Sequence, residues 1–154
     1  MFTSSGQRKR DNLVRVGTFE GLAEVLRPVI NEIPGMVSQR VKSTGAGASG
    51  SFSTPYSRGW ARERNKKGLQ TSKKDFWFTG DMWGTFKLVE EKIDAGGIVF
   101  TLASDGSLGH NGEHLVDIHS KNEGQNILEL TQEEFNEIDK KIMDAINKYF
   151  ARWL

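Results

Sequence analysis

The chain has 154 residues and a formal net charge of +1, so its length fits one domain and its overall charge does not favour nucleic acid or an anionic membrane as a partner. It contains no cysteine, which excludes disulfides, thiolate metal sites and a cysteine nucleophile. No apolar run reaches the roughly 18 residues of a membrane helix, so we expect no membrane partner.

Residues 1–17 are predicted to form a basic, flexible N-terminal tail ahead of a single domain over residues 18–154. The segment from Met1 to Asn12 is polar and carries Arg8, Lys9 and Arg10. A segment this polar cannot bury enough surface to order itself. It also has no apolar core, so we do not expect a signal peptide.

The segment that follows has a helical pattern. Apolar residues recur at steps of three and four from Phe19 to Val41, which places them on one face of a helix, and Thr18 can cap its start. Pro28 and Pro34 fall inside the pattern. A proline in a helix interior costs about 3 kcal/mol. The segment is therefore predicted to be a kinked helix, or two short helices in line, with a buried apolar stripe.

Residues 43–75 are predicted to form a flexible loop. It begins with a Gly/Ser-rich run over residues 43–51, which has no lysine after its glycines and no apolar strand before it. A phosphate-binding loop is therefore not expected. A basic stretch from Arg58 to Lys74 follows, with Tyr56 just before it and Trp60 within it.

The remainder of the chain is predicted to hold the regular structure. Residues 85–94 and 98–103 flank a short glycine-containing turn, which favours a β-hairpin. Thr131 and Glu134 have capping-box spacing, and the apolar period behind them predicts a helix over residues 131–152. We therefore predict an α+β fold, in which a small antiparallel β-sheet is packed by an N-terminal kinked helix and a long C-terminal helix.

One motif suggests an enzyme. The sequence His110-Asn111-Gly112-Glu113-His114 has the H-x-x-E-H spacing of inverted zinc proteases. That chemistry needs both imidazoles one helical turn apart, with a carboxylate beside them. Glycine and asparagine inside the motif disfavour a helix, so a surface loop is the preferred interpretation. We predict no catalytic residue, no metal and no cofactor, and keep a small metal-dependent hydrolase as the least favoured alternative.

Charges of opposite sign gather in two parts of the chain. In the basic stretch, lysine and arginine can neutralise phosphates while Tyr56 and Trp60 can stack on bases. A nucleic-acid-binding module using residues 56–74 is therefore a second alternative function. The last helix instead carries acidic residues, including Glu133 and Glu137. Two patches of opposite charge suit head-to-tail packing of identical subunits, which closes into rings.

Several short motifs also occur in a fixed order. The helical segment 18–26 is followed by Tyr56-x-x-x-Trp60 and a basic run that ends in Lys-Lys-Gly at residues 66–68. The turn Phe-Thr-Gly-Asp-Met-Trp-Gly-Thr-Phe at residues 78–86 precedes the hairpin, and Leu-Thr-Gln-Glu-Glu at residues 130–134 opens the last helix. In this order the chain resembles the virion-morphogenesis and tail-completion (neck) proteins of tailed bacteriophages, of the Mu-like and lambdoid kind.

The resemblance implies a non-catalytic structural subunit of the virion, made in the host cytoplasm and placed in the neck or tail as a tail-completion, tail-terminator or connector protein. Its implied partners are copies of itself in a hexameric ring and the neighbouring neck and tail-tube proteins, with packaged DNA as a further contact. We expect the assembly contacts to come from the basic stretch, the turn before the hairpin and the last helix, at Tyr56, Arg58, Trp60, Arg62, Arg64, Lys66, Lys67, Trp83, Glu133, Glu134 and Glu137.

Overall fold

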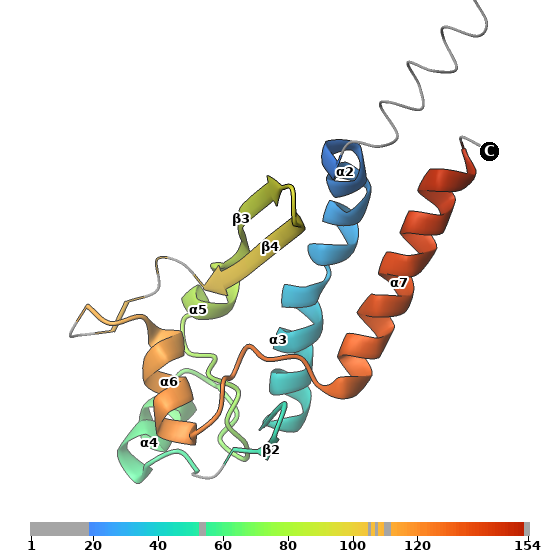
Figure 1. Cartoon of the computed structure of the whole chain (residues 1–154). Helices are drawn as coiled ribbons and strands as arrows, with labels where there is room; N and C mark the ends of the chain where they lie inside the picture. The colour runs from blue at the N-terminus through green and yellow to red at the C-terminus, as the bar shows by residue number, and fades with distance from the viewer. Residues whose placement is uncertain (1–18, 53–54, 105, 107, 110–111, 153–154) are drawn as a thin grey trace, which may run out of the picture.

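The computed structural model describes residues 19–52, 55–104, 106, 108–109 and 112–152 (Figure 1). The predicted tail, the predicted cap Thr18, His110 with Asn111, and Trp153 lie outside these residues. The elements are α2 (Phe19–Ile30), α3 (Ile33–Thr44), β1 (Ala46–Gly47), β2 (Gly50–Ser51), α4 (Arg58–Lys66), α5 (Asp81–Gly84), β3 (Phe86–Asp94), β4 (Gly97–Ser104), α6 (Leu115–Glu123) and α7 (Gln132–Ala151).

The two N-terminal helices lie end to end, with α7 on one side of them and the β3–β4 hairpin on the other (Figure 1). The chain breaks at a turn over residues 31–32, after Pro28 in the last part of α2. Pro34 occupies the first turn of α3, where its missing N–H removes no helical hydrogen bond. The prediction of two helices in line is confirmed, and both helices contribute to the core through their apolar stripe.

The region predicted as a loop over residues 43–75 contains regular structure, which corrects that prediction. Gly45 caps α3 in the left-handed conformation, with φ of 66°. The short antiparallel ribbon β1–β2 follows directly, pairing Ala46 with Ser51. Its backbone is held by distant side chains, because Arg40 Nη1 donates to Ala46 O at 2.8 Å and the Ser49 N–H donates to Gln125 Oε1 at 3.2 Å. The Gly/Ser-rich composition of this segment does not indicate that Arg40 and Gln125 would bond to it.

The predicted hairpin is confirmed. Strands β3 and β4 are antiparallel, with pairing from Phe86–Ser104 to Asp94–Gly97 and an irregularity between Leu88 and Glu90. A two-stranded sheet is marginal alone and needs packing on a helix. Here Arg27 of α2 donates to both carboxylate oxygens of Glu91 on β3, at 2.9 and 3.0 Å. The α+β fold with a small antiparallel sheet, a broken N-terminal helix and a long C-terminal helix is therefore as predicted.

The core lies where α3, α5, α7 and the start of β3 meet. Val37, Val41 and Ile127 are fully buried there, and Ile138 of α7 and Phe86 of β3 pack against them. Burial of apolar side chains of this size contributes about 1.5–3 kcal/mol each, so this cluster fixes α7 against α3. Within the described residues, no helix is long and apolar enough to cross a membrane.

Helix α7 begins within one residue of its predicted start. Thr131 Oγ1 accepts from the Glu134 N–H at 3.1 Å, and Glu134 Oε2 accepts from the Thr131 N–H at 2.9 Å, which completes the predicted capping box. Arg40 of α3 donates to the other Glu134 oxygen at 2.9 Å and to Glu129 O at 2.7 Å. One arginine therefore ties the start of α7 and the loop before it to α3.

Replacing Thr131 by alanine removes the acceptor for the Glu134 N–H and should lower the free energy of unfolding by about 1 kcal/mol. Thr131→Ser keeps a hydroxyl acceptor and should retain most of the stability. Urea denaturation of both variants measures the difference. Equal stability of the alanine and serine variants would contradict the role assigned to the cap.

Candidate functional site

A buried ion pair organises the region between α4 and α5. The Arg64 side chain is 1% exposed, and its Nη2 donates to Asp75 Oδ1 and Oδ2 at 2.9 and 3.1 Å. Its Nε donates to Gln70 O at 2.9 Å, and Nη1 donates to Trp77 O. The guanidinium is thus held by two backbone carbonyls as well as by the carboxylate, as a buried charge requires.

The Asp75 carboxylate is equally well satisfied. Besides Arg64, it accepts from the Tyr56 hydroxyl at 2.9 Å, from Gln70 Nε2 at 2.7 Å and from the Trp77 N–H at 2.9 Å. The Asp75 carbonyl accepts from the Trp83 indole N–H at 2.9 Å. Five residues therefore donate hydrogen bonds to Asp75, and together they hold α4, the 70–77 segment and α5 in place.

The next residue, Phe76, has a left-handed backbone with φ of 51°, which is uncommon for a residue other than glycine. Its N–H donates to the Tyr56 hydroxyl at 3.2 Å, which helps to hold this conformation. The ring lies between Phe52 and His119, with centroid distances of 4.8 and 4.6 Å. The strained backbone therefore turns an aromatic ring toward α6.

A pocket of about 510 Å³ opens between α4, the 76–82 segment and α6. The Trp60 and Phe78 rings form a tilted stack, with their centroids 4.6 Å apart and 32° between their planes, and the Lys67 ammonium lies 4.5 Å from the Phe78 ring centroid. Trp60 is 44% exposed, so this stack is open to solvent at the pocket. The walls are mainly aromatic and apolar, and include Tyr56, Trp60, Phe76, Phe78, Leu108 and His119.

Two polar side chains give the pocket a hydrogen-bonding edge. Asp81 lines it, and its carboxylate accepts from the Thr79 hydroxyl at 2.6 Å. His119 lines it from α6, and burial together with the nearby Lys74 charge lowers the pKa of its imidazole. The imidazole is therefore neutral at neutral pH, with one nitrogen that donates and one that accepts.

The outer surface of α4 is basic. Arg58, Arg62 and Lys66 recur at steps of four and share one helix face. Lys66 pairs with Glu63 at 2.6 Å, whereas exposed Arg58 and Arg62 form no ion pair with any described residue. We call these three residues the α4 basic ridge.

An acidic surface lies across the molecule from α4, on α7 (Figure 1). Glu133 and Glu137 are exposed and one helical turn apart. Glu137 pairs with Lys141 at 2.9 Å, and Lys141 also reaches Glu32 at 2.6 Å. Glu133 has no ion-pair partner among the described residues. We call Glu133 and Glu137 the α7 acidic ridge.

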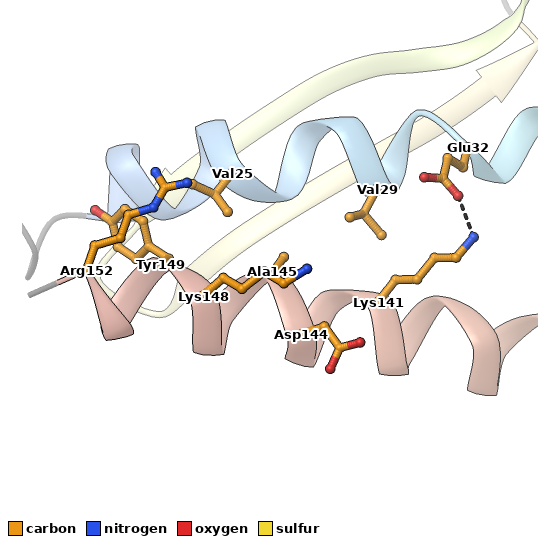
Figure 2. A pocket seen from close by; sticks show the side chains of 9 residues that line it. All are labelled: Val25, Val29, Glu32, Lys141, Asp144, Ala145, Lys148, Tyr149 and Arg152. Carbon is orange, nitrogen blue, oxygen red and sulfur yellow. Dashed lines mark hydrogen bonds and ion pairs between the residues drawn. The ribbon is translucent and has the colours of Figure 1, made fainter. Parts of the chain in front are cut away.

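A groove of about 380 Å³ lies between α2 and α7, floored by Val25, Val29 and Ala145 (Figure 2). The Lys141–Glu32 ion pair crosses one end of it. The helices approach closely at Gly21, where an added Cβ would lie 2.3 Å from the Tyr149 hydroxyl. Among the lining charges, Lys141 pairs with Glu32, and the lining residues place no nucleophile beside a base.

Three of the predicted assembly residues serve the fold instead, and their assignment is corrected. Arg64 forms the buried ion pair. Trp83 is 7% exposed, and its indole N–H donates to the Asp75 carbonyl. Glu134 completes the capping box and accepts a hydrogen bond from Arg40. Tyr56 is partly buried, with its hydroxyl in the Asp75 network. The remaining predicted residues are exposed, namely Arg58, Trp60, Arg62, Lys66, Lys67, Glu133 and Glu137.

The spacing of residues along α4 distinguishes the buried Arg64 from the exposed basic residues of the same helix. Arg64 lies four residues after Trp60, on the side of the helix that faces the protein, while the basic ridge lies about half a turn away. The sequence analysis missed Asp75, Phe78 and His119 as members of the site. Only the tertiary contacts of these three residues identify them.

The zinc-protease spacing does not form a helical site. His110 and Asn111 lie outside the described residues. Gly112 has φ of 73°, and His114 has an extended backbone just before α6, so Glu113 and His114 do not lie on a helix turn. In the part of the chain that the structure describes, no group of three or more histidine, aspartate or glutamate residues is placed to hold a metal.

Comparisons with protein-family models, with curated proteins and with solved structures give no match for this chain.

Replacing Arg64 by alanine leaves the Asp75 carboxylate buried beside an unfilled space. The free energy of unfolding should fall by about 3–5 kcal/mol. Arg62→Ala is the matched control on the same helix, and its exposed side chain predicts a change within about 0.5 kcal/mol. Chemical denaturation of the two variants tests this, and similar values for both would refute the structural role of Arg64.

Burial raises the pKa of the Tyr56 phenol to about 12, against a smaller opposing effect of the Asp75 N–H. Because the unfolded value is about 10, the neutral phenol contributes stability below pH 10 that is lost as the pH rises toward 12. In Tyr149→Phe, Tyr56 is the remaining tyrosine of the two. Tyrosinate absorbance should then appear near pH 12 in the folded protein and near pH 10 in urea. A folded midpoint near pH 10 would show that the phenol is not buried as described.

Proposed function

We propose that the protein is a structural subunit that assembles head to tail with copies of itself, as a neck or tail-completion ring protein of a tailed phage. The observation that supports this is the pair of oppositely charged ridges on α4 and α7, which lie on different sides of the molecule (Figure 1). The proposal of a phage protein rests on the order of the sequence motifs, and the proposal of the contact surfaces rests on the ridges.

The ridges suit an interface because the fold leaves three of their five residues without an ion pair to any described residue, while Lys66 and Glu137 each pair with a residue of the same helix. Arg58, Arg62 and Glu133 are exposed and have no ion-pair partner among the described residues. Paired charges elsewhere hold elements together, as in Arg40–Glu134 and Lys141–Glu32. Unpaired charges that recur at helical spacing can meet a ridge of the opposite sign on a neighbour, which steers association and sets its orientation.

The placement of the ridges also determines the symmetry of the assembly. A contact between α4 of one copy and α7 of the next joins two different surfaces, so the first copy keeps its α7 ridge free and the second keeps its α4 ridge free. Such a heterologous contact continues from copy to copy and closes into a ring when the rotation between neighbours divides the circle.

Charge-reversal variants should show whether the α4 basic ridge of one copy contacts the α7 acidic ridge of the next. Arg58→Glu with Arg62→Glu should stop self-association at low ionic strength, and so should Glu133→Lys with Glu137→Lys, because like charges then face each other. A mixture of the two variants should assemble again with the variants alternating, because every α4–α7 contact between them joins opposite charges. The protein with all four substitutions should assemble again. Sedimentation velocity measures each of these states.

The matched control is Lys87→Glu with Lys121→Glu, which makes the same charge change at two exposed lysines on β3 and α6. This control should assemble as the parent protein does. Self-association of the α4 variant at the parent level would refute the charged contact. Absence of the protein from purified phage particles would refute the virion role.

A further inference from the structure

The aromatic pocket is a binding site that assembly through the ridges does not use. Trp60 lies two residues from both Arg58 and Arg62, so it lies on nearly the opposite side of α4 from the basic ridge. The pocket is also distinct from the core, because Trp60 and Leu108 at its edge are 44% and 55% exposed. Large apolar side chains left open around a hollow mark a place where a ligand can be buried.

The shape and lining of the pocket favour a flat ligand. Trp60 and Phe78 form a stack whose outer member is open to solvent, and Phe76 and His119 provide a second pair of rings in the same pocket. A planar ring entering here can continue the Trp60–Phe78 stack, an arrangement that contributes strongly to binding of unpaired bases. The volume of about 510 Å³ accommodates one such ring with its attached sugar.

The polar groups favour a heterocycle that has both donors and acceptors. The Asp81 carboxylate can accept from a ring N–H or an amino group, and the neutral His119 imidazole can donate to a ring carbonyl or accept from a donor. A simple hydrocarbon ring would make no hydrogen bond to either group. A nucleobase satisfies both and keeps its π-face on the stack.

The charges around the stack favour an anion over a cation. Lys67 lies over Phe78, Arg64 lies 4.3 Å from the Tyr56 ring centroid, and Lys74 lies 6.0 Å from that of Phe76. Arg64 and Lys74 pair with Asp75 and Glu123, so the attraction for an anion comes from Lys67. Lys67 is exposed and forms no ion pair with a described residue, which leaves its ammonium available to a phosphate.

We propose that this pocket binds an unstacked base of single-stranded nucleic acid, with Trp60 and Phe78 as the stacking platform and Lys67 beside an adjoining phosphate. The inference is independent of assembly through the ridges, because it uses the other side of α4. A base in a duplex is stacked on both faces and cannot enter, so the site distinguishes single strands from duplexes.

Fluorescence anisotropy with labelled oligothymidylate and oligouridylate of about 15 nucleotides tests the proposal on the full chain. Trp60→Ala should weaken binding about ten-fold or more, while Trp60→Phe, which keeps a stacking ring, should retain most of the affinity. Lys67→Ala should reduce the slope of log affinity against log salt by about 0.7, the value for one lost phosphate contact. The oligomer bound more tightly identifies DNA or RNA as the preferred strand.

Phe135→Ala and Lys87→Ala are the controls, because they remove an exposed aromatic ring and an exposed cation far from the pocket. Both should bind like the parent protein, and thermal unfolding should confirm that every variant is folded. The proposal is overturned if neither oligomer binds at low salt, or if the Trp60→Ala protein binds as tightly as the parent. It is equally overturned if a duplex competes as well as the single strand.

Discussion

The buried ion pair between Arg64 and Asp75 is the interaction on which this half of the molecule depends. Moving two charges out of water costs several kcal/mol each, and their attraction offsets this only when the other hydrogen bonds are complete. Here the guanidinium also reaches two backbone carbonyls, and the carboxylate accepts from Tyr56, Gln70 and the Trp77 N–H. Because nearly every donor and acceptor is used, α4 has one well-defined position relative to the 70–77 segment.

The fixed position of α4 has consequences on both of its sides. Its inner side places Trp60 against Phe78 and forms one wall of the aromatic pocket. Its outer side holds the basic ridge in one orientation, and a charged surface that is already ordered loses less entropy when it binds. A segment whose composition suggests a mobile basic loop is therefore a rigid support. The strained backbone of Phe76 fits the same view, because the Asp75 network can hold a conformation that a free loop would not keep.

The sequence allowed the elements with local signals to be predicted, and it failed where distant contacts decide. The capping box of Thr131 and Glu134, the apolar period of α7 and the hairpin turn are local, and each is found in the structure. The ribbon β1–β2 and the inward direction of Arg64 depend on Gln125, Arg40 and Asp75, which lie elsewhere in the chain. For the site, Arg58, Arg62 and Lys66 share one face only because their segment, predicted as a flexible loop, is helical. That His119 would meet Phe76 is visible only in three dimensions.

The charged residues fall into two classes that respond differently to salt. Arg64 and Arg40 are at most slightly exposed, with 1% and 12% of their side chains open, so added salt screens their partners weakly. Arg58, Arg62 and Glu133 face solvent, where ions at physiological strength screen charges over about 8 Å. Raising the salt concentration should therefore weaken contacts between copies while the fold persists. If the proposed contact between copies forms, this separation allows it to be broken by salt without unfolding the protein, since Arg64 and Arg40 hold the fold while Arg58, Arg62 and Glu133 face a partner.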